Sequence, residues 1–377
     1  MTRTIRPPAP RAETSNAEDA SEARSLRERL RGGARRFVTA AFAPVDGASL
    51  AAWRATVGGG LAFWALKQLT DRGDGRTWAD GYWGDPARHF KYTGFEWVAA
   101  PAEPYLSWLL LAVAAAGLAL ACGLFTRVSA ALTALGFTWL VLIERTTYQN
   151  HYYLLVLVSW ATVLLPLGHV WSADNRLWGR APRAVPRWAV WLVQFQVGLP
   201  YFYGGVAKLN ADWLSGEPMA NMLYGQEALA DTWLAPLTAV LPGGAADEWF
   251  PQTALAFAWG GLALDLVIVP LLLWRPTRRP AYLGAVLFHL TNATLFTIGV
   301  FPWFMILATL IFFPPDWPRQ LLARVRFVPR RLLLPPTTVA AFPTGPRRRA
   351  ATLAALGLYV SSQCLIPLRH HLYEGSP

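Results

Sequence analysis

Charged residues are scarce in this chain of 377 residues. Asp, Glu, Lys and Arg together make up 15% of it, compared with roughly 25% in an ordinary soluble protein. The hydrophobic content of 54% excludes disorder over most of the length. With only two cysteines, Cys122 and Cys364, the chain is not a disulfide-stabilised scaffold. So little polar surface cannot cover a soluble body of this size, and we expect an all-α polytopic membrane protein.

Motifs of several common enzyme classes are also missing. The lone cysteines and scattered histidines have no zinc-ligand spacing, so we expect no metal. There is no phosphate-binding loop, no dinucleotide fingerprint and no convincing Ser-His-Asp order. The net charge of +11 is better explained by basic flanks of membrane spans than by nucleic-acid binding. The chemistry must therefore come from polar residues placed among apolar ones.

Eight apolar stretches follow a basic N-terminal segment. The stretch at 281–314 is equivalent to about 51 Å of helix, which is too long for one crossing of a 30 Å hydrocarbon core. Gly299 and Pro302 lie near its middle and predict a tight break between two shorter spans. The apolar stretches are 51–69, 104–125, 127–143, 152–171, 188–207, 252–274, 281–314 and 349–367.

Charge placement predicts the topology. With the basic N-terminus inside, the arginine-rich pieces at 172–187, 275–280 and 315–349 also fall inside if 281–314 crosses twice. The large loop 208–251 then falls outside with one basic residue. This pattern favours nine crossings, and eight crossings with a re-entrant hairpin is the alternative. We expect a disordered basic cytoplasmic tail over 1–45 and a transmembrane domain over 46–377.

Asn150 and His151 begin the fourth span at its outer end. Ionisable groups in a membrane span are costly and mark candidate sites. Asn is also a favoured residue at the start of a helix, so a polar helix cap is the other interpretation.

Lys208 follows eight aromatic, Gly and apolar residues at the outer end of the fifth span. A lysine near a helix end commonly extends to water. In dry surroundings the charged amine is disfavoured, and a neutral amine becomes available as a base. Gly204 and Gly205 would let a ligand or another helix approach the backbone closely.

His289 and Asn292 lie three residues apart inside the seventh span, so they share a helix face. They are expected either to form a functional site or to hold helices together. The outside loop 84–97 mixes aromatic and charged residues and suits either a cap over a pocket or an interfacial anchor. The topology allows one outward-facing cavity to collect Lys208, His289, Asn150-His151 and this loop.

At these residues the sequence resembles the vitamin K-dependent gamma-carboxylases and their bacterial relatives with a horizontally transferred transmembrane (HTTM) domain. The resemblance runs in family order from about residue 50 to the end of the chain. It rests on six stretches: Arg-His-Phe-Lys-Tyr-Thr-Gly-Phe-Glu-Trp at 88–97, Asn-His-Tyr-Tyr at 150–153, Tyr-Gly-Gly-Val-Ala-Lys-Leu-Asn-Ala-Asp-Trp at 203–213, Phe-His-Leu-Thr-Asn-Ala-Thr-Leu-Phe-Thr-Ile-Gly-Val-Phe-Pro at 288–302, Pro-Asp-Trp-Pro-Arg at 315–319 and Pro-Leu-Arg-His-His-Leu-Tyr at 367–373.

The resemblance implies an enzyme that uses a reduced vitamin K or menaquinol-type naphthoquinone, O₂ and CO₂. Such an enzyme carboxylates protein glutamate and forms the quinone epoxide. By motif position, Lys208 is similar to the family's base, and Asn150, His151 and His289 are similar to its polar active-site residues. We expect Asn292, Tyr203, Gly204 and Gly205 to bind the quinol.

The expected partners are the lipid bilayer, a lipid-soluble quinol and a glutamate-containing protein, with no nucleic acid. The expected location is a bacterial inner membrane, with the N-terminus cytoplasmic and the active site facing the extracytoplasmic side. The animal enzymes of this family continue into a large luminal domain, which is not expected here. Quinol epoxidation without peptide carboxylation, a quinone-binding protein and a non-enzymatic membrane partner therefore remain alternatives.

Overall fold

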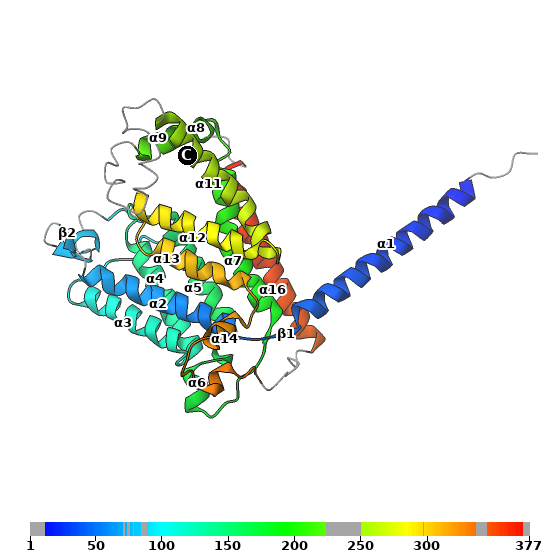
Figure 1. Ribbon diagram of the computed structural model, residues 1–377, viewed down its shortest axis with the longest axis horizontal. Coiled ribbons are helices and arrows are strands. Elements are labelled where there is room, and N and C mark those ends of the chain that lie inside the picture. The colour runs from blue at the N-terminus through cyan, green and yellow to red at the C-terminus, as the bar shows by residue number, and fades with distance from the viewer. Residues whose placement is uncertain are drawn as a thin grey trace, which may run out of the picture.

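The computed structural model describes residues 12–70, 72–73, 76–77, 79–83, 89–223, 250–296, 298–336 and 345–371. Helices dominate this part of the chain (Figure 1). The elements are α1 (Ala12–Ala41), β1 (Pro44–Val45), α2 (Ala48–Thr70), β2 (Arg72–Gly73), β3 (Arg76–Thr77), a π-helical turn (Ala79–Trp83), α3 (Tyr105–Cys122), α4 (Thr126–Ile143), α5 (Asn150–Leu164), a 3₁₀ turn (Leu167–His169), α6 (Ala173–Leu177), β4 (Val185–Pro186), α7 (Arg187–Ala207), α8 (Ala211–Ser215), α9 (Glu217–Leu223), α11 (Phe250–Leu273), α12 (Arg278–Leu295), α13 (Phe301–Ala308), a 3₁₀ turn (Thr309–Phe312), α14 (Trp317–Leu322), α15 (Arg330–Leu333), α16 (Pro346–Leu365) and a 3₁₀ turn (Ile366–His371).

Helix α1 corrects the expectation of a disordered tail over 1–45. Residues Ala12–Ala41 form one long helix that projects away from the bundle (Figure 1). Its sequence is rich in Ala, Arg and Glu, which have high helix propensities. Its C-terminal part touches the bundle where the rings of Phe37 and Trp191 stack at 5.8 Å. The low hydrophobicity of this segment therefore does not mean that it lacks secondary structure.

Helices α2 to α5 pack in chain order, each against the next, and helix α2 also contacts α13. Gly58 and Gly117 bring α2 and α3 together, because a Cβ atom added to Gly58 would fall 2.4 Å from the Gly117 carbonyl oxygen. Small residues allow this backbone contact, which is how helices associate where lipid removes the hydrophobic driving force. Phe137 and Leu140 of α4 are fully buried in the resulting core.

The second half of the bundle is built around α7 and α11, which contact each other closely. Helix α11 also packs on α12, and α12 packs on α13. Helix α16 is attached to α7 by two tyrosines: the Tyr359 hydroxyl donates to Gln196 and the Tyr203 hydroxyl donates to the Cys364 carbonyl oxygen.

Four helices within the described residues are long and apolar enough to cross a membrane, namely α3, α4, α11 and α16. The apolar stretch 281–314 is divided into α12 and α13 at the predicted position. Gly299 has a φ of +59°, and Pro302 lies at the start of α13. The apolar stretch 152–171 extends beyond the helix, because α5 ends at Leu164. Pro166 forces the residue before it into an extended conformation, which stops the helix.

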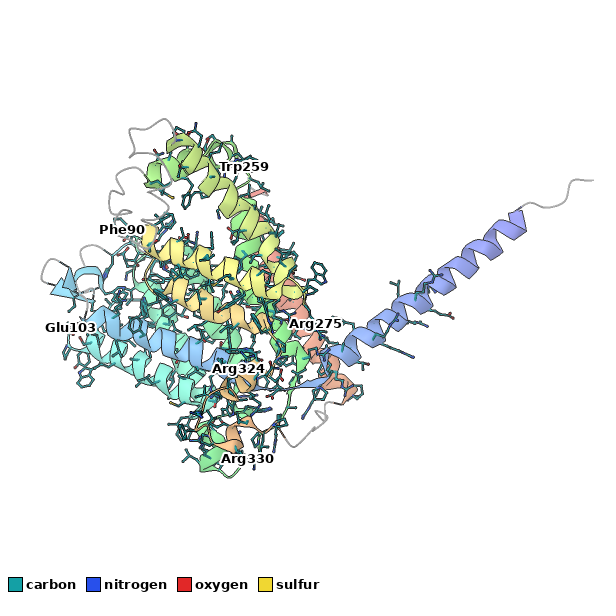
Figure 2. All side chains as sticks on the ribbon, in the orientation of Figure 1. Phe90, Glu103, Trp259, Arg275, Arg324 and Arg330 are labelled. Atoms are coloured by element: carbon teal, nitrogen blue, oxygen red, sulfur yellow. The ribbon has the colours of Figure 1, made fainter. Side chains whose placement is uncertain are left out.

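The bundle has two chemically different ends. Figure 2 shows Phe90 and Glu103 at one end, and Arg275 and Arg324 toward the other. We call the second one the basic end; β1 pairs with β4 there, and Arg319 forms an ion pair with Asp46. Helices α2, α4, α7 and α12 begin at the basic end, and Lys208 lies at the opposite end, where α7 stops.

Candidate functional site

Lys208 forms an ion pair with a carboxylate that comes from another helix. Its Nζ atom lies 2.6 Å from Oδ2 of Asp265 in α11 and donates a second hydrogen bond to the Gly204 carbonyl oxygen at 3.2 Å. The ammonium also lies over the ring of Trp213, 5.1 Å from its centroid, which adds a cation–π contact. We call Lys208, Asp265, Gly204 and Trp213 the ion-pair site.

The sequence predicted Lys208 in this site but missed Asp265. The Asp265 side chain is only 6% exposed, and that of Lys208 is 19% exposed. An unpaired carboxylate at such a depth is costly, whereas a paired one persists. Asp265 lies within the apolar stretch 252–274, and its charge there was the available signal. The structure thus places Lys208 beside a carboxylate and not in wholly apolar surroundings.

Gly204 and Gly205 allow α11 to approach α7. A Cβ atom added to Gly204 would lie 3.1 Å from Oδ2 of Asp265, and one added to Gly205 would lie 2.6 Å from Cδ2 of Leu266. Of the two possibilities left open by the sequence, close approach of a helix is the one that the structure contains. Tyr203 bonds to α16 through its hydroxyl group and is not a hydrogen-bonding partner of the ion-pair site.

His289 is buried and joined to two hydroxyl groups. Its Nε2 atom lies 2.6 Å from the Tyr201 hydroxyl, which lies 3.2 Å from Oγ1 of Thr309. In the tautomer in which the Tyr201 hydroxyl donates to Nε2, the ring proton is on Nδ1. Nδ1 is buried and has no hydrogen-bond partner among the described residues. In that tautomer the Nδ1–H group can donate a hydrogen bond to an oxygen atom of a ligand.

Phe301 connects the two predicted histidines. The His151 ring stacks on it at 5.2 Å, and the His289 ring meets it edge to face at 6.2 Å. Both contacts form because α13 starts next to the beginning of α5 and the end of α12. We call His151, Phe301, His289, Tyr201 and Thr309 the histidine cluster. It unites residues from five segments, and the sequence predicted only its two histidines.

The two predicted asparagines do not join these hydrogen-bond networks. Asn150 is exposed, and its Oδ1 atom accepts a hydrogen bond from the Tyr148 hydroxyl at 3.1 Å. Asn292 is half-buried, and no side-chain hydrogen bond to it occurs within the described residues. Asn150 is the first residue of α5, but the N-cap is Gln149 and no side chain caps the helix, so neither the polar-cap interpretation nor a place beside His289 is supported.

The outside loop contacts the end of α4. Residues 84–88 of the predicted loop 84–97 lie outside the described residues. Of the remainder, Lys91 donates from Nζ to the carbonyl oxygens of Val98 and Ile143 at 2.7 and 3.1 Å. The Phe90 amide donates to the Glu144 carboxylate. A cation at the C-terminal end of a helix is favourable, so this part of the loop anchors α4.

Helix α7 holds the ion-pair site and the histidine cluster in a fixed relation. Tyr201 and Lys208 are seven residues apart, so they lie on the same face about two turns, or ~10 Å, apart. Gly204 and Gly205 lie between them on α7, facing α11. Lys208 at the end of α7 thus contacts Asp265 of α11, and Tyr201, about two turns earlier on the same face, contacts His289 of α12.

Comparison with known proteins gives one family. The HTTM domain family model matches residues 42–317, a region that contains every residue of both groups. No solved structure matches the chain.

Proposed function

The chain belongs to the HTTM domain family, and we propose that it is a membrane enzyme acting on a reduced naphthoquinone. The reaction would oxygenate the quinol to its epoxide and couple this to carboxylation of protein glutamate. HTTM domains occur in proteins related to vitamin K-dependent carboxylases. The observation that carries the proposal is the partly buried ion pair of Lys208 and Asp265, about two helical turns from a histidine cluster in which Nδ1 of His289 has no partner among the described residues.

The residues present fit a flat aromatic diol. His289 offers a buried Nδ1 atom with no partner among the described residues, and Phe301 offers an aromatic ring beside it. When bound, the reduced naphthoquinone would supply the electrons for reaction with O₂ and the strong base that removal of a glutamate γ-hydrogen requires. The His151 ring stacks on the same Phe301 ring at 5.2 Å.

Lys208 is the proposed base, and Asp265 is its proposed partner in proton transfer. The Lys208–Asp265 pair has no net charge, and a proton that passes from Nζ to Oδ2 across their 2.6 Å contact would leave a neutral amine beside a neutral carboxyl group; that amine would then take the quinol proton. Lys208 Nζ is then both the proton relay and the positive charge that stabilises a newly formed anion. Because Asp265 is 6% exposed, water competes little for this proton.

The proposed arrangement in the membrane has nine crossings. The nine proposed crossings are helices α2, α3, α4, α5, α7, α11, α12, α13 and α16, which would run alternately between the two ends. The positive-inside rule places the basic end in the cytoplasm. The ion-pair site is then extracytoplasmic in a bacterial inner membrane. A quinol would reach it through the bilayer, and a glutamate-containing protein from outside.

The test uses the purified full-length chain in lipid nanodiscs with a reduced menaquinone-type naphthoquinone and O₂. Epoxide is measured by mass spectrometry for the unaltered protein and for Asp265→Asn. The proposal predicts epoxide formation that depends on Asp265. No epoxide from a folded, quinol-containing sample would reject the enzyme and favour a quinone-binding or non-enzymatic partner protein.

Carboxylation needs its own measurement. The same sample is given ¹³C-labelled CO₂ and a glutamate-rich peptide, and label in the peptide is read by mass spectrometry. Labelled peptide together with epoxide supports the coupled reaction. Epoxide without labelled peptide would contradict the coupled reaction and indicate a quinol epoxidase.

A further inference from the structure

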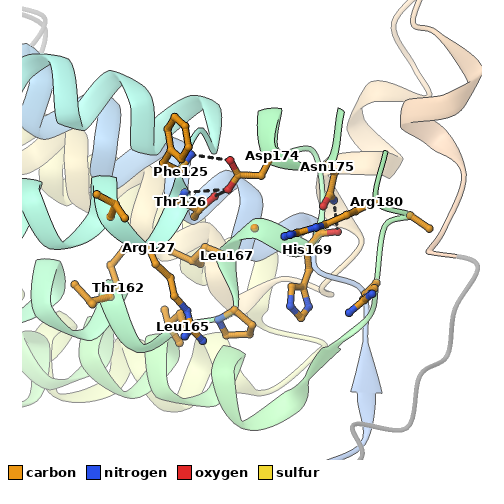
Figure 3. Close-up of a pocket in the computed structure, with 16 residues that line it drawn as sticks. Phe125, Thr126, Arg127, Thr162, Leu165, Leu167, His169, Asp174, Asn175 and Arg180 are labelled. Atoms are coloured by element: carbon orange, nitrogen blue, oxygen red, sulfur yellow. Dashed lines mark hydrogen bonds between the residues drawn. The ribbon is translucent and has the colours of Figure 1, made fainter. Parts of the chain in front are cut away.

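A cavity of about 310 Å³ opens at the basic end, far along the bundle from the ion-pair site. It lies where α4 begins, where α5 ends and where the segment around α6 turns back (Figure 3). No predicted site residue lines it. Its volume is at the lower end of the range for small-molecule sites, so it suits a compact group.

The wall of this cavity carries an excess of positive charge. Arg127 comes from the first turn of α4, and Arg180 and Arg183 come from the segment after α6. None of these three arginines is in an ion pair with a carboxylate of the described residues. Burial lowers the pKa of His169, which also lines the cavity, and the charges of Arg183 and Arg127 lower it further. His169 is therefore neutral at pH 7 and leaves the charge to the arginines.

The one carboxylate in the cavity wall is already fully used. Asp174 accepts hydrogen bonds from the Phe125 and Thr126 amides at 2.6 and 2.9 Å, and from the Thr126 hydroxyl at 2.7 Å (Figure 3). These bonds fix the start of α4. With both oxygens of Asp174 bound, the three guanidinium groups have no carboxylate in the wall left to pair with.

Apolar side chains extend from the cavity along the outside of the bundle. Val128, Leu132 and Leu135 share one face of α4 and are exposed, and so is Leu164 at the end of α5. In a membrane protein such a face is in contact with acyl chains. Val128 lines the cavity as well, so the polar opening and the apolar face are continuous.

We propose that this cavity binds the phosphate headgroup of an anionic glycerophospholipid. Arg127, Arg180 and Arg183 would bind the phosphate, for which guanidinium groups have matching geometry. The acyl chains would lie on the exposed face of α4. Basic pockets between membrane helices at the cytoplasmic surface bind anionic headgroups for the same physical reason. The site is separate from the proposed quinol chemistry and stands or falls independently of it.

The test measures lipid binding to the purified full-length protein in detergent by native mass spectrometry. The probes are phosphatidylglycerol, phosphatidylcholine of the same chain length, and sn-glycerol 3-phosphate without chains. We expect phosphatidylglycerol to bind at least about tenfold more tightly than either comparison probe. Equal binding of the two lipids, or of the free headgroup, would overturn the proposal.

Variants locate the site. Changing Arg127, Arg180 and Arg183 together to Gln is expected to weaken phosphatidylglycerol binding more than about tenfold. The matched control changes three exposed arginines at the same end that do not line the cavity: Arg324, Arg326 and Arg330. If the first triple variant does not fold, Arg127→Gln alone must still weaken binding several-fold. Unchanged binding in the cavity variant, or equal losses in both triple variants, would contradict the assignment.

Discussion

The Nζ atom of Lys208, at the C-terminal end of α7, lies 2.6 Å from Oδ2 of Asp265 in the middle of α11. This pair joins α7 and α11 through two charges, each of which would be unfavourable alone. The two groups differ in depth, because Asp265 is 6% exposed and Lys208 is 19% exposed. The consequences of removing one partner should therefore differ from those of removing the other.

The first prediction concerns stability. Lys208→Ala should lower the free energy of unfolding by about 3 kcal/mol, because it leaves the deeper carboxylate without its partner. Asp265→Ala should cost less, since the lysine at a helix end can extend to water. The variant with both changes should be more stable than Lys208→Ala alone. Thermal unfolding in detergent measures all three, and additive losses would show that the pair is not coupled.

The second prediction concerns the histidine cluster. Tyr201→Phe should destabilise the protein by roughly 1–3 kcal/mol, because it leaves Nε2 of His289 buried without a partner. Thr309→Val is the matched control, since it removes only the 3.2 Å bond to the same hydroxyl group. The unfolding midpoint should fall clearly further for Tyr201→Phe. Equal midpoints would mean that the bond to His289 contributes nothing.

The third prediction concerns the contact of α7 with α11. Gly205→Ala should separate the helices, because the new Cβ atom would fall 2.6 Å from Cδ2 and 2.9 Å from Cγ of Leu266. The separation should lengthen the Lys208–Asp265 pair and lower both the unfolding midpoint and any quinol oxidation. Gly260→Ala on α11 meets nothing within 4 Å and should be neutral or slightly stabilising. A harmless Gly205→Ala would contradict the close packing.

The helices were largely predictable from the sequence, because long apolar stretches and their breaks reveal membrane spans directly. Gly299 and Pro302 correctly marked the division between α12 and α13. The predicted end of the stretch 152–171 was wrong. Apolar residues continue past Pro166, but the α-helix ends at Leu164. Helix α1 differs from the predicted disordered tail because its residues have high helix propensity, although the segment has low hydrophobicity.

The candidate site was predictable only in part. Lys208, His151 and His289 stood out because polar residues in apolar stretches are costly. Their partners come from distant segments, and no spacing rule connects Lys208 with Asp265 or His289 with Tyr201. The charge of Asp265 inside an apolar stretch is the sequence signal that identifies it as a candidate. Asn150 is a candidate because it precedes His151 in the sequence. In the structure its side chain is exposed and accepts a hydrogen bond from the Tyr148 hydroxyl.

The proposed role of Lys208 as the base is the central claim, and epoxide formation by two variants tests it most directly. Lys208→Ala removes the amine, and Lys208→Arg keeps a positive charge for Asp265 but provides a group that does not act as a base. Lys67→Ala, near the end of α2 on the same side of the bundle, is the control. The rate of epoxide formation from the reduced naphthoquinone should fall roughly a hundredfold or more in both Lys208 variants and stay unchanged in the control. A folded Lys208→Arg or Lys208→Ala protein that forms epoxide at the unaltered rate would contradict the account.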